Sequence, residues 1–258
     1  MVGVPQAHPS GAAPRSGGMG VIIGTAGWSI PTDVAAAFPA EGSSLERYAA
    51  RFAGAEINSS FHRRHRESTW QRWAESVPAA FRFSVKLPKT ITHVRKLAGC
   101  EEEVAHFIEE VRPLGAKLAV LLVQLPPKLA FDAALAEPFF AALGRRTTAL
   151  LACEPRHPTW FDDEADALLK ALEVARVAAD PAVVEAAGVP GGWSGIAYWR
   201  LHGSPRMYRS SYDEQRLDAY AAQMRAPLRE GRQVWCIFDN TAGSAAAGNA
   251  LALMEKLS

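Results

Sequence analysis

Several apolar segments of this sequence end in charged side chains that are spaced two residues apart. Glu154 precedes Arg156 in this way, and Arg200 precedes His202. Because alternate residues of a β-strand point to the same side, each pair is expected to share one face of a strand. Carboxylate, guanidinium and imidazole groups together are suited to acid–base chemistry and to the binding of anions.

The other candidates follow the same rule, since each lies at or just beyond the end of an apolar segment. The predicted catalytic candidates are Glu154, His202, Asp180 and Asp239, and the predicted ligand-binding residues are Trp28, Glu56, Asn58, Lys86, Gln124, Arg156, His157, Arg200 and Asn240. Buried charges are costly unless they are paired, so the charged members should form a mutually neutralising network. That network either faces a ligand or closes one end of the fold as a structural plug.

Hydrolysis is the first chemistry that these residues suggest, because cleavage of a glycosidic or similar bond needs two carboxylates in unlike environments. Glu154 is the candidate base or nucleophile, since Arg156 on the same face would keep it ionised. Asp180, Asp239 or Glu56 would supply the second carboxylate. The alternative interpretation is that Glu154 and Arg156 form an ion pair with a purely structural role.

The working hypothesis is a site for a small anionic or polyhydroxylated ligand, such as a sugar or a phosphate, that is bound and, in an enzyme, hydrolysed. Arg156 and Arg200 would clamp the anion, and His202 would donate or relay a proton. Asn58 and Asn240 would orient the ligand. A polar site of this kind also binds without reacting, so the sequence leaves catalysis open.

Lysine chemistry and metal chemistry are two further alternatives. Lys86 among apolar walls would have a lowered pKa and would form a Schiff base with a carbonyl compound, although an ion pair with Glu56 or Glu154 is the favoured interpretation. A divalent metal would be held by Glu154, Asp180, His202 and Asp239. No local spacing such as His-Glu-x-x-His supports a metal, and no cofactor is predicted.

A binding function without catalysis comes from two basic segments. The first comprises Arg63, Arg64, His65 and Arg66, and the second Lys89, His93, Arg95 and Lys96, with Trp28, Phe61 and Trp160 expected nearby. Cations interleaved with aromatic rings are typical of surfaces that bind nucleotides or single-stranded nucleic acid. The alternative is that these residues are ordinary solvated loops.

The elements that position these residues alternate between short apolar segments and helical patterns. The predicted strands are 21–28, 55–61, 81–87, 118–125, 149–156, 175–180, 195–202 and 233–240, and the predicted helices are 43–52, 69–76, 101–114, 135–143, 163–172, 213–228 and 243–257. Ser44 and Asp162 are expected to cap helices. This alternation predicts one (β/α)₈ barrel over residues 20–258. An open doubly wound sheet is the second choice, because no phosphate-binding glycine loop follows the first strand.

Bulk properties fit one globular domain of 258 residues. Net charge is +1, from 28 Lys and Arg against 27 Asp and Glu, which lacks the basic excess of a surface built throughout for nucleic acid. The three cysteines, Cys100, Cys153 and Cys236, have no metal-binding or disulfide spacing. No apolar run reaches the roughly 18 residues of a membrane span. We therefore expect a cytoplasmic protein, with residues 1–19 as a disordered tail.

Seven motifs in order carry a family resemblance. They are GTAGW (24–28), EINSSFHR (56–63), FSVKLP with ITH (83–88 and 91–93), LLVQLPP (121–127), CEPRHPTWF (153–161), WRLHG (199–203) and FDNTAGSAAAGNA (238–250). The chain resembles the YecE-like family, domain of unknown function 72, over residues 22–253. That resemblance implies a TIM-like barrel in the bacterial cytoplasm and no particular reaction. The chain departs from the family pattern at Ile30-Pro31, at His62 and at Asp239-Asn240, so its ligand need not be shared by the family.

Overall fold

A computed structural model describes residues 20–258, in which strands alternate with helices along the chain. The predicted N-terminal tail, residues 1–19, lies outside the described residues. Within the described part, no helix combines the length and the apolar character that crossing a membrane requires.

The elements match the predicted alternation. The strands are β1 (Val21–Thr25), β2 (Gly54–Ile57), β3 (Arg82–Lys86), β4 (Leu118–Gln124), β5 (Leu150–Glu154), β6 (Val174–Arg176), β7 (Ala178–Asp180), β8 (Gly191–Gly192), β9 (Ile196–Leu201) and β10 (Gln233–Phe238). The α-helices are α1 (Ser44–Ala49), α2 (Glu67–Glu75), α3 (Glu101–Val111), α4 (Ala133–Gly144), α5 (Asp163–Ala171), α6 (Glu214–Arg229) and α7 (Ala246–Leu257). Short helical turns connect them, among them η2 (Ser59–Phe61), η3 (Thr90–Val94), η5 (Pro158–Phe161) and η6 (Glu185–Gly188).

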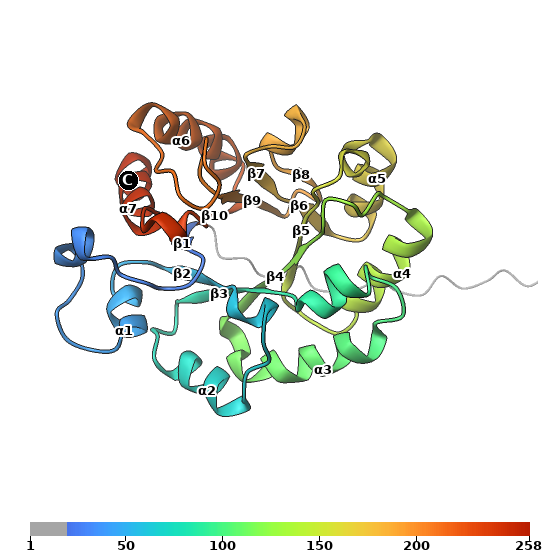
Figure 1. Ribbon diagram of the computed structural model, residues 1–258, viewed down its shortest axis with the longest axis horizontal. Coiled ribbons are helices and arrows are strands. Elements are labelled where there is room, and N and C mark those ends of the chain that lie inside the picture. The colour runs from blue at the N-terminus through green and yellow to red at the C-terminus, as the bar shows by residue number, and fades with distance from the viewer. Residues whose placement is uncertain (1–19) are drawn as a thin grey trace, which may run out of the picture.

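The strands pair in parallel, apart from the two-residue β8, which runs antiparallel to β6. One set has the order β1-β10-β9-β7 and the other β2-β3-β4-β5-β6-β8. The two sets meet twice, because Val177 alone separates β6 from β7 and Ala26 forms an isolated parallel bridge with Glu56. Figure 1 shows the helices at the periphery and the strands toward the middle. The predicted α/β fold of parallel strands in one domain is confirmed.

The strands end earlier than the sequence indicated. The second strand was expected to continue to residue 61, but β2 ends at Ile57 and the backbone of Asn58 is already helical. The predicted end of this strand is therefore wrong. The sixth predicted strand is likewise two short strands, β6 and β7, interrupted at Val177.

Side-chain caps fix where several helices begin. The Ser43 hydroxyl accepts a hydrogen bond from the Glu46 amide at 3.3 Å, and the Glu46 carboxylate accepts one from the Ser43 amide at 2.7 Å. This reciprocal cap satisfies amides that a helix start leaves unpaired. The predicted cap, Ser44, was wrong by one residue. Asp213 caps α6 by accepting from the Arg216 amide at 2.9 Å.

Apolar side chains form two clusters on opposite faces of the strands. The larger fills the space between strands and helices and includes Phe83, Phe107 and Leu201. The smaller consists of the buried side chains Ile22, Val120, Leu122, Leu150, Ala152, Ala175, Val177, Ile196, Tyr198, Trp235 and Ile237. Because the strands are covered on both faces, their sequences are nearly continuous apolar runs.

Gly54 leaves room for the smaller cluster. A Cβ at this position would lie 2.6 Å from Ile22 Cγ2 and 2.8 Å from the Arg82 carbonyl oxygen. The Trp235 ring would be 3.5 Å away. A larger residue would therefore push apart the strands that frame the interior.

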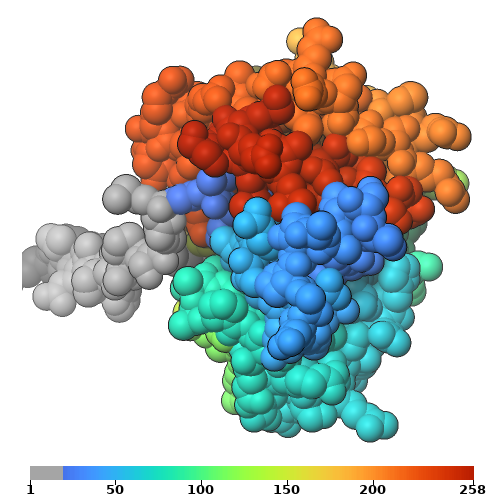
Figure 2. All heavy atoms as spheres, turned by 90° about the vertical axis from the view of Figure 1, so that its left-hand side faces the viewer, coloured from blue at the N-terminus to red at the C-terminus, as the bar shows by residue number. Residues whose placement is uncertain are grey.

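The first and last elements of the described chain lie side by side. β1 pairs with β10 from Val21 opposite Val234 to Thr25 opposite Phe238. Figure 2 shows the blue N-terminal segments packed against the red C-terminal ones. Residues near both ends of the sequence therefore contribute to the same edge of the fold.

Candidate functional site

Strand β9 supplies the centre of a buried polar cluster at the carboxyl ends of the strands. Trp199 and Leu201 pack toward the helices, whereas Tyr198 packs on the opposite face. Arg200 and His202 follow Tyr198 at two-residue spacing and share carboxylate partners. The alternation of a single strand thus presents a phenol, a guanidinium and an imidazole to one side.

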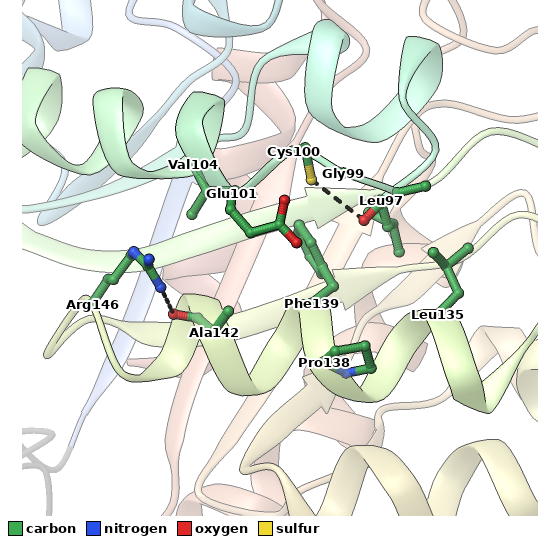
Figure 3. Close-up of a pocket in the computed structure, with 11 residues that line it drawn as sticks. Leu97, Gly99, Cys100, Glu101, Val104, Leu135, Pro138, Phe139, Ala142 and Arg146 are labelled. Carbon is green, nitrogen blue, oxygen red and sulfur yellow. Dashed lines mark hydrogen bonds between the residues drawn. The ribbon is translucent and has the colours of Figure 1, made fainter.

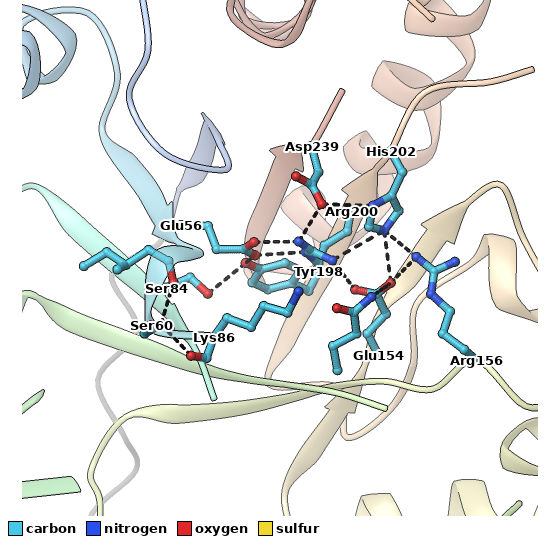
Figure 4. A network of polar contacts seen from close by, with 12 residues as sticks. Glu56, Ser60, Ser84, Lys86, Glu154, Arg156, Tyr198, Arg200, His202 and Asp239 are labelled. Carbon is cyan, nitrogen blue, oxygen red and sulfur yellow. Dashed lines mark hydrogen bonds and ion pairs between the residues drawn. The ribbon is translucent and has the colours of Figure 1, made fainter. Parts of the chain in front are cut away.

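Arg200 has no exposed surface and contacts three carboxylates (Figure 4). Its Nε and Nη2 donate to Glu56 at 2.9 and 2.6 Å. Its Nη1 donates to Glu154 at 2.5 Å, and Nη2 also donates to Asp239 at 3.0 Å. A planar fork of five N–H groups suits this arrangement. Since the fork is fully buried and engaged, it is not placed to clamp a ligand as the sequence had suggested.

Glu154 is a second centre of the cluster and is also fully buried. It accepts a hydrogen bond from Arg200 and forms an ion pair with Arg156. Burial alone would raise the pKa of the Glu154 carboxyl, but Arg156, Arg200 and His202 outweigh it and hold the pKa well below its usual range. A carboxylate that stays ionised and unexposed is a weak base, so the geometry favours a structural role for the Glu154–Arg156 pair.

His202 lies between two carboxylates and a guanidinium. Its Nδ1 is 3.1 Å from Asp239 Oδ2, and its Nε2 is 3.0 Å from Glu154 Oε1 and 2.6 Å from Arg156 Nη2. A ring with its proton on Nδ1 donates to Asp239 and accepts from Arg156 at Nε2, so this tautomer satisfies both contacts.

Tyr198 and Ser84 belong to the cluster although the sequence analysis did not select them. The Tyr198 hydroxyl lies 3.1 Å from Glu56 Oε2 and 2.9 Å from Ser84 Oγ. Burial and the Glu56 charge raise the pKa of Tyr198 well above its usual range, so the phenol remains a neutral donor. The two-residue spacing of Tyr198 from Arg200 was the signal that would have identified it.

Lys86, the last residue of β3, reaches the cluster without joining its ion pairs. Its Nζ lies 4.1 Å from the centre of the Phe61 ring, and within residues 20–258 this amine has no hydrogen-bond or ion-pair partner. Burial and the charge of Arg200 lower the pKa of Lys86 to about 8, against the opposing effect of the carboxylates. The favoured expectation of an ion pair with Glu56 or Glu154 is therefore wrong.

Three predicted amides occupy different surroundings. Gln124 lies at the edge of the cluster, with Nε2 3.5 Å from Glu154 Oε1. Asn240 is fully buried and donates to Asn249 at 2.9 Å, which ties the end of β10 to α7. The Oδ1 atoms of Asn58 and Asn240 are buried with no partner among the described residues. Only Gln124 of these three contacts the carboxylates.

Asp180 is separated from the other carboxylates. It accepts a hydrogen bond from the Tyr212 hydroxyl at 2.6 Å and pairs with Arg216 at 2.8 Å, so it faces the start of α6. The proposed metal set of Glu154, Asp180, His202 and Asp239 is therefore not assembled. Among residues 20–258, no three His, Cys, Asp or Glu side chains are grouped to hold a metal ion.

His157 and Trp28 also lie apart from the cluster. His157 Nδ1 is 3.0 Å from Thr159 Oγ1, within the turn that follows β5. The Trp28 ring packs edge-on against Trp73 of α2, with ring centres 5.2 Å apart. Both residues act locally in the packing of loops and helices.

The predicted basic rim is partly neutralised. The loops after β2 and β3 border a groove of about 480 Å³ against α3, lined by Ser60, Phe61, His62, Arg63, Arg64, Pro88, Lys89, Thr90, Val94, Glu103, His106, Phe107 and Glu110. Arg64 pairs with Glu110 at 2.8 Å, and Arg95 pairs with Glu103 at 2.7 Å. Trp160, one of the expected stacking residues, is 1% exposed. Of the three aromatic residues expected beside the basic loops, Phe61 alone lines this groove.

A separate pocket of about 180 Å³ lies between the start of α3 and α4 (Figure 3). It is lined by Leu97, Ala98, Gly99, Cys100, Glu101, Val104, Leu135, Pro138, Phe139, Ala142 and Arg146. None of the predicted site residues lines it. The carboxyl-end cluster therefore remains the candidate site.

Tyr208, in the loop between β9 and α6, lies against the cluster. Its ring centre is 5.6 Å from that of His202 in an edge-on arrangement, and its amide donates to the His202 carbonyl at 2.5 Å. The residue is 40% exposed, so its ring connects the buried cluster with solvent. Its position depends on the path of a loop, so the strand pattern could not identify it.

Together the fold and the site define an α/β protein whose parallel strands share a buried cluster of carboxylates, arginines and one histidine at their carboxyl ends. A family model described as a protein of unknown function, DUF72, matches residues 22–258, and the chain belongs to this family. The family resemblance predicted from the motifs is thereby confirmed.

Two curated proteins are similar to part of the chain. They are the UPF0759 protein YecE of Escherichia coli K12 and that of Escherichia coli O157:H7, each 32% identical over 106 residues. The match covers 41% of this chain and 38% of either relative, so the chain matches less than half of their length.

Two solved structures of DUF72 family proteins share the fold. The structure from Enterococcus faecalis V583 has a TM-score of 0.77 and 20% identity, covering 92% of this chain and 95% of the other. The structure from Thermotoga maritima MSB8 has a TM-score of 0.76 and 23% identity, covering 92% and 98%. At this level of identity, the likeness establishes the fold alone.

Proposed function

We propose that this protein binds a small anionic ligand, such as a phosphate or a sugar acid, at the carboxyl ends of the strands of a closed TIM-like (β/α)₈ barrel. Closure is supported by the two places where the strand sets meet, at Val177 and at the Ala26–Glu56 bridge. In barrels of this kind, ligand sites are built at the carboxyl ends of the strands.

The observation that carries the proposal is a pair of cations that retain hydrogen-bonding capacity beside the cluster. Lys86 and Arg156 are 7% and 9% exposed, whereas Arg200 is completely buried. The Lys86 amine has no ion-pair partner in the described chain, and Arg156 Nη1 makes only a 3.4 Å contact with the Pro181 carbonyl. These two groups have donors left for an anion.

The buried part of the cluster supports Arg156, one of these two cations, through Glu154. Arg200 binds Glu56, Glu154 and Asp239 at once, so the carboxylates are held by a residue that the ligand does not reach. Such a network holds the Arg156 guanidinium in a fixed position although Arg156 lies in the loop after β5. Arg156 is positioned by the same carboxylate, Glu154.

Acid–base chemistry at this site would use Lys86 in place of Glu154. A lysine whose pKa lies at about 8 exchanges its proton near neutral pH, whereas the carboxylate of Glu154 remains ionised there. The proposed function is therefore anion binding next to a titratable amine. Hydrolysis that depends on Glu154 as a nucleophile has less support from the geometry.

Calorimetric titration with inorganic phosphate, followed by sugar phosphates and sugar acids, tests the proposal. The Lys86→Met and Arg156→Ala variants should bind at least about tenfold more weakly, because each loses one charged hydrogen-bond donor. Arg95→Ala is the matched control, since Arg95 pairs with Glu103 at the surface. Circular dichroism checks folding. Equal affinity in the wild type and in both folded site variants contradicts the proposed site.

A further inference from the structure

Lys86 is a buried amine at the candidate site, and its place in the fold differs from that of an ordinary surface lysine. It is the last residue of β3, and its side chain crosses the face of the Phe61 ring with Nζ 4.1 Å from the ring centre. Figure 4 shows this side chain extended toward Arg200, with no dashed contact at its amine. The amine is enclosed and has no hydrogen-bond or ion-pair partner among residues 20–258.

The carboxylates that would normally hold an ammonium are already engaged by Arg200. Glu56, Glu154 and Asp239 all contact that guanidinium within 3.0 Å. The carboxylates are thus bound to a cation that never loses its proton, and Lys86 lies next to this positive charge. Enclosure beside a second cation is the arrangement that turns a lysine into a nucleophile.

We propose that Lys86 forms a Schiff base with a small carbonyl compound that carries an anionic group, such as a 2-oxo acid or a phosphorylated aldehyde. This inference rests on the proposed function, because Arg156 would bind the anionic group while Lys86 meets the carbonyl carbon.

The reaction needs no oxidant or further reagent. The lone pair of the neutral Lys86 amine forms a bond to the carbonyl carbon, and the carbonyl π electrons move to oxygen. A proton passes from nitrogen to that oxygen, which gives a carbinolamine. Loss of water then leaves a carbon–nitrogen double bond, so amine plus carbonyl compound gives imine plus water. At pH 7.5 a lysine of pKa about 8 is roughly one-quarter neutral, against about a thousandth for a free lysine.

Reductive trapping of the full chain tests this inference. The protein is incubated at pH 7.5 with pyruvate, glyoxylate or glyceraldehyde 3-phosphate and sodium cyanoborohydride, and then analysed by intact-mass and peptide mass spectrometry. We expect one adduct at Lys86, with a gain equal to the mass of the carbonyl compound less one oxygen atom. Labelling of Lys86 should be at least about tenfold faster than that of exposed Lys89.

The pH dependence of trapping gives a second readout. The groups that face Lys86 are Glu56 from β2, Glu154 from β5, Arg200 from β9, Asp239 after β10 and His93 from η3. The rate at Lys86 should reach half of its maximum near pH 8, whereas an exposed lysine reaches it above pH 10. Equal pH profiles for Lys86 and Lys89 contradict the inference.

Two variants separate this inference from the proposed function. Lys86→Arg retains the positive charge, so it should keep phosphate binding but form no adduct at residue 86. Lys89→Arg should keep both phosphate binding and the adduct at Lys86. Phosphate binding by a wild-type protein that forms no adduct at Lys86 overturns the Schiff base and leaves the anion site intact. Loss of phosphate binding in Arg156→Ala, with adduct formation still dependent on Lys86, supports both.

Discussion

Arg200 and Glu56 form a two-point ion pair between strands that are 144 residues apart in sequence. Both side chains have no exposed surface, and the two donor–acceptor distances are 2.9 and 2.6 Å. Arg200 lies in one set of strands and Glu56 in the other, so the pair links the two sets from the inside. The cluster thus holds the two sets of strands together and positions Arg156 through Glu154.

Replacing Arg200 by Met should lower the free energy of unfolding by about 3–5 kcal/mol. The substitution leaves three buried carboxylates without their shared cation, which costs more than loss of a surface pair. Arg200→Lys keeps the positive charge but loses the planar guanidinium with its several N–H donors. We therefore expect a smaller decrease in unfolding free energy, about 1–2 kcal/mol. Urea denaturation followed by tryptophan fluorescence measures both.

The matched control is an exposed ion pair of similar length. Lys256 pairs with Asp218 at 2.6 Å on the surface, where Asp218 is 63% exposed. Lys256→Met should cost less than about 1 kcal/mol because solvent already screens both charges. Similar losses for Arg200→Met and Lys256→Met show that the buried cluster is not a stabilising centre.

Acid should destabilise the fold through Glu154 and Asp239. The native pKa of each carboxyl lies below its value in the unfolded chain, since Arg200 and neighbouring cations outweigh the effect of burial. Their contribution to stability is thus complete above the unfolded pKa values of about 4 and is lost as the pH falls through the native values. We expect the free energy of unfolding, measured by urea denaturation, to fall steeply between pH 5 and pH 3 and less steeply in Asp239→Asn.

Asp218→Asn is the control for this pH dependence, because it removes an exposed carboxyl of the same type. Its unfolding free energy should follow the wild-type slope between pH 5 and pH 3. If Asp239→Asn also keeps that slope, the acid sensitivity arises elsewhere in the protein.

The strand alternation and much of the cluster were predictable from the sequence, because both depend on local periodicity. Continuous apolar runs marked strands covered on both faces, and the spacing of Arg200 from His202 placed them on one side. The same periodicity contained Tyr198, which was overlooked because it lies within an apolar run. Local patterns therefore identify which residues face inward.

The partners of those residues were not predictable, since they depend on the stagger between strands that are distant in sequence. Lys86 was expected to pair with Glu56, but Arg200 occupies that carboxylate. Asp180 ends a strand like its neighbours, yet its carboxylate turns to Arg216 at the start of α6. Asn58 left the strand because the chain turns directly after β2. Register and loop path, and not residue type, decided these outcomes.

Gly54→Ala should destabilise the protein by about 1–3 kcal/mol, because the added methyl group meets the Arg82 carbonyl, which is backbone and does not give way easily. Gly248→Ala in α7 is the control. Its Cβ would lie 3.5 Å from Val34 Cγ1, an ordinary contact, and Ala favours a helix by up to about 1 kcal/mol over Gly. Thermal unfolding should thus show a lower Tm for Gly54→Ala and an unchanged or higher one for Gly248→Ala. A tolerated Gly54→Ala contradicts the close packing at β2.

Lys86→Met should stabilise the folded protein by about 1–2 kcal/mol at pH 7, because it removes a buried ammonium that enclosure and Arg200 disfavour. The native pKa of Lys86, about 8, lies below the unfolded value, so between pH 8 and about pH 10.4 the unfolded chain binds more protons and wild-type stability rises with pH. Below pH 8 Lys86 is charged in the native protein and destabilises it fully. The gain in unfolding free energy from Lys86→Met should therefore be smaller at pH 9.5 than at pH 7. Urea denaturation at both pH values measures this change, and exposed Lys89→Met should show no such dependence. The opposite result is a difference in unfolding free energy, Lys86→Met minus wild type, that is lower at pH 7 than at pH 9.5. It would indicate that the cluster holds the Lys86 ammonium in an ion pair.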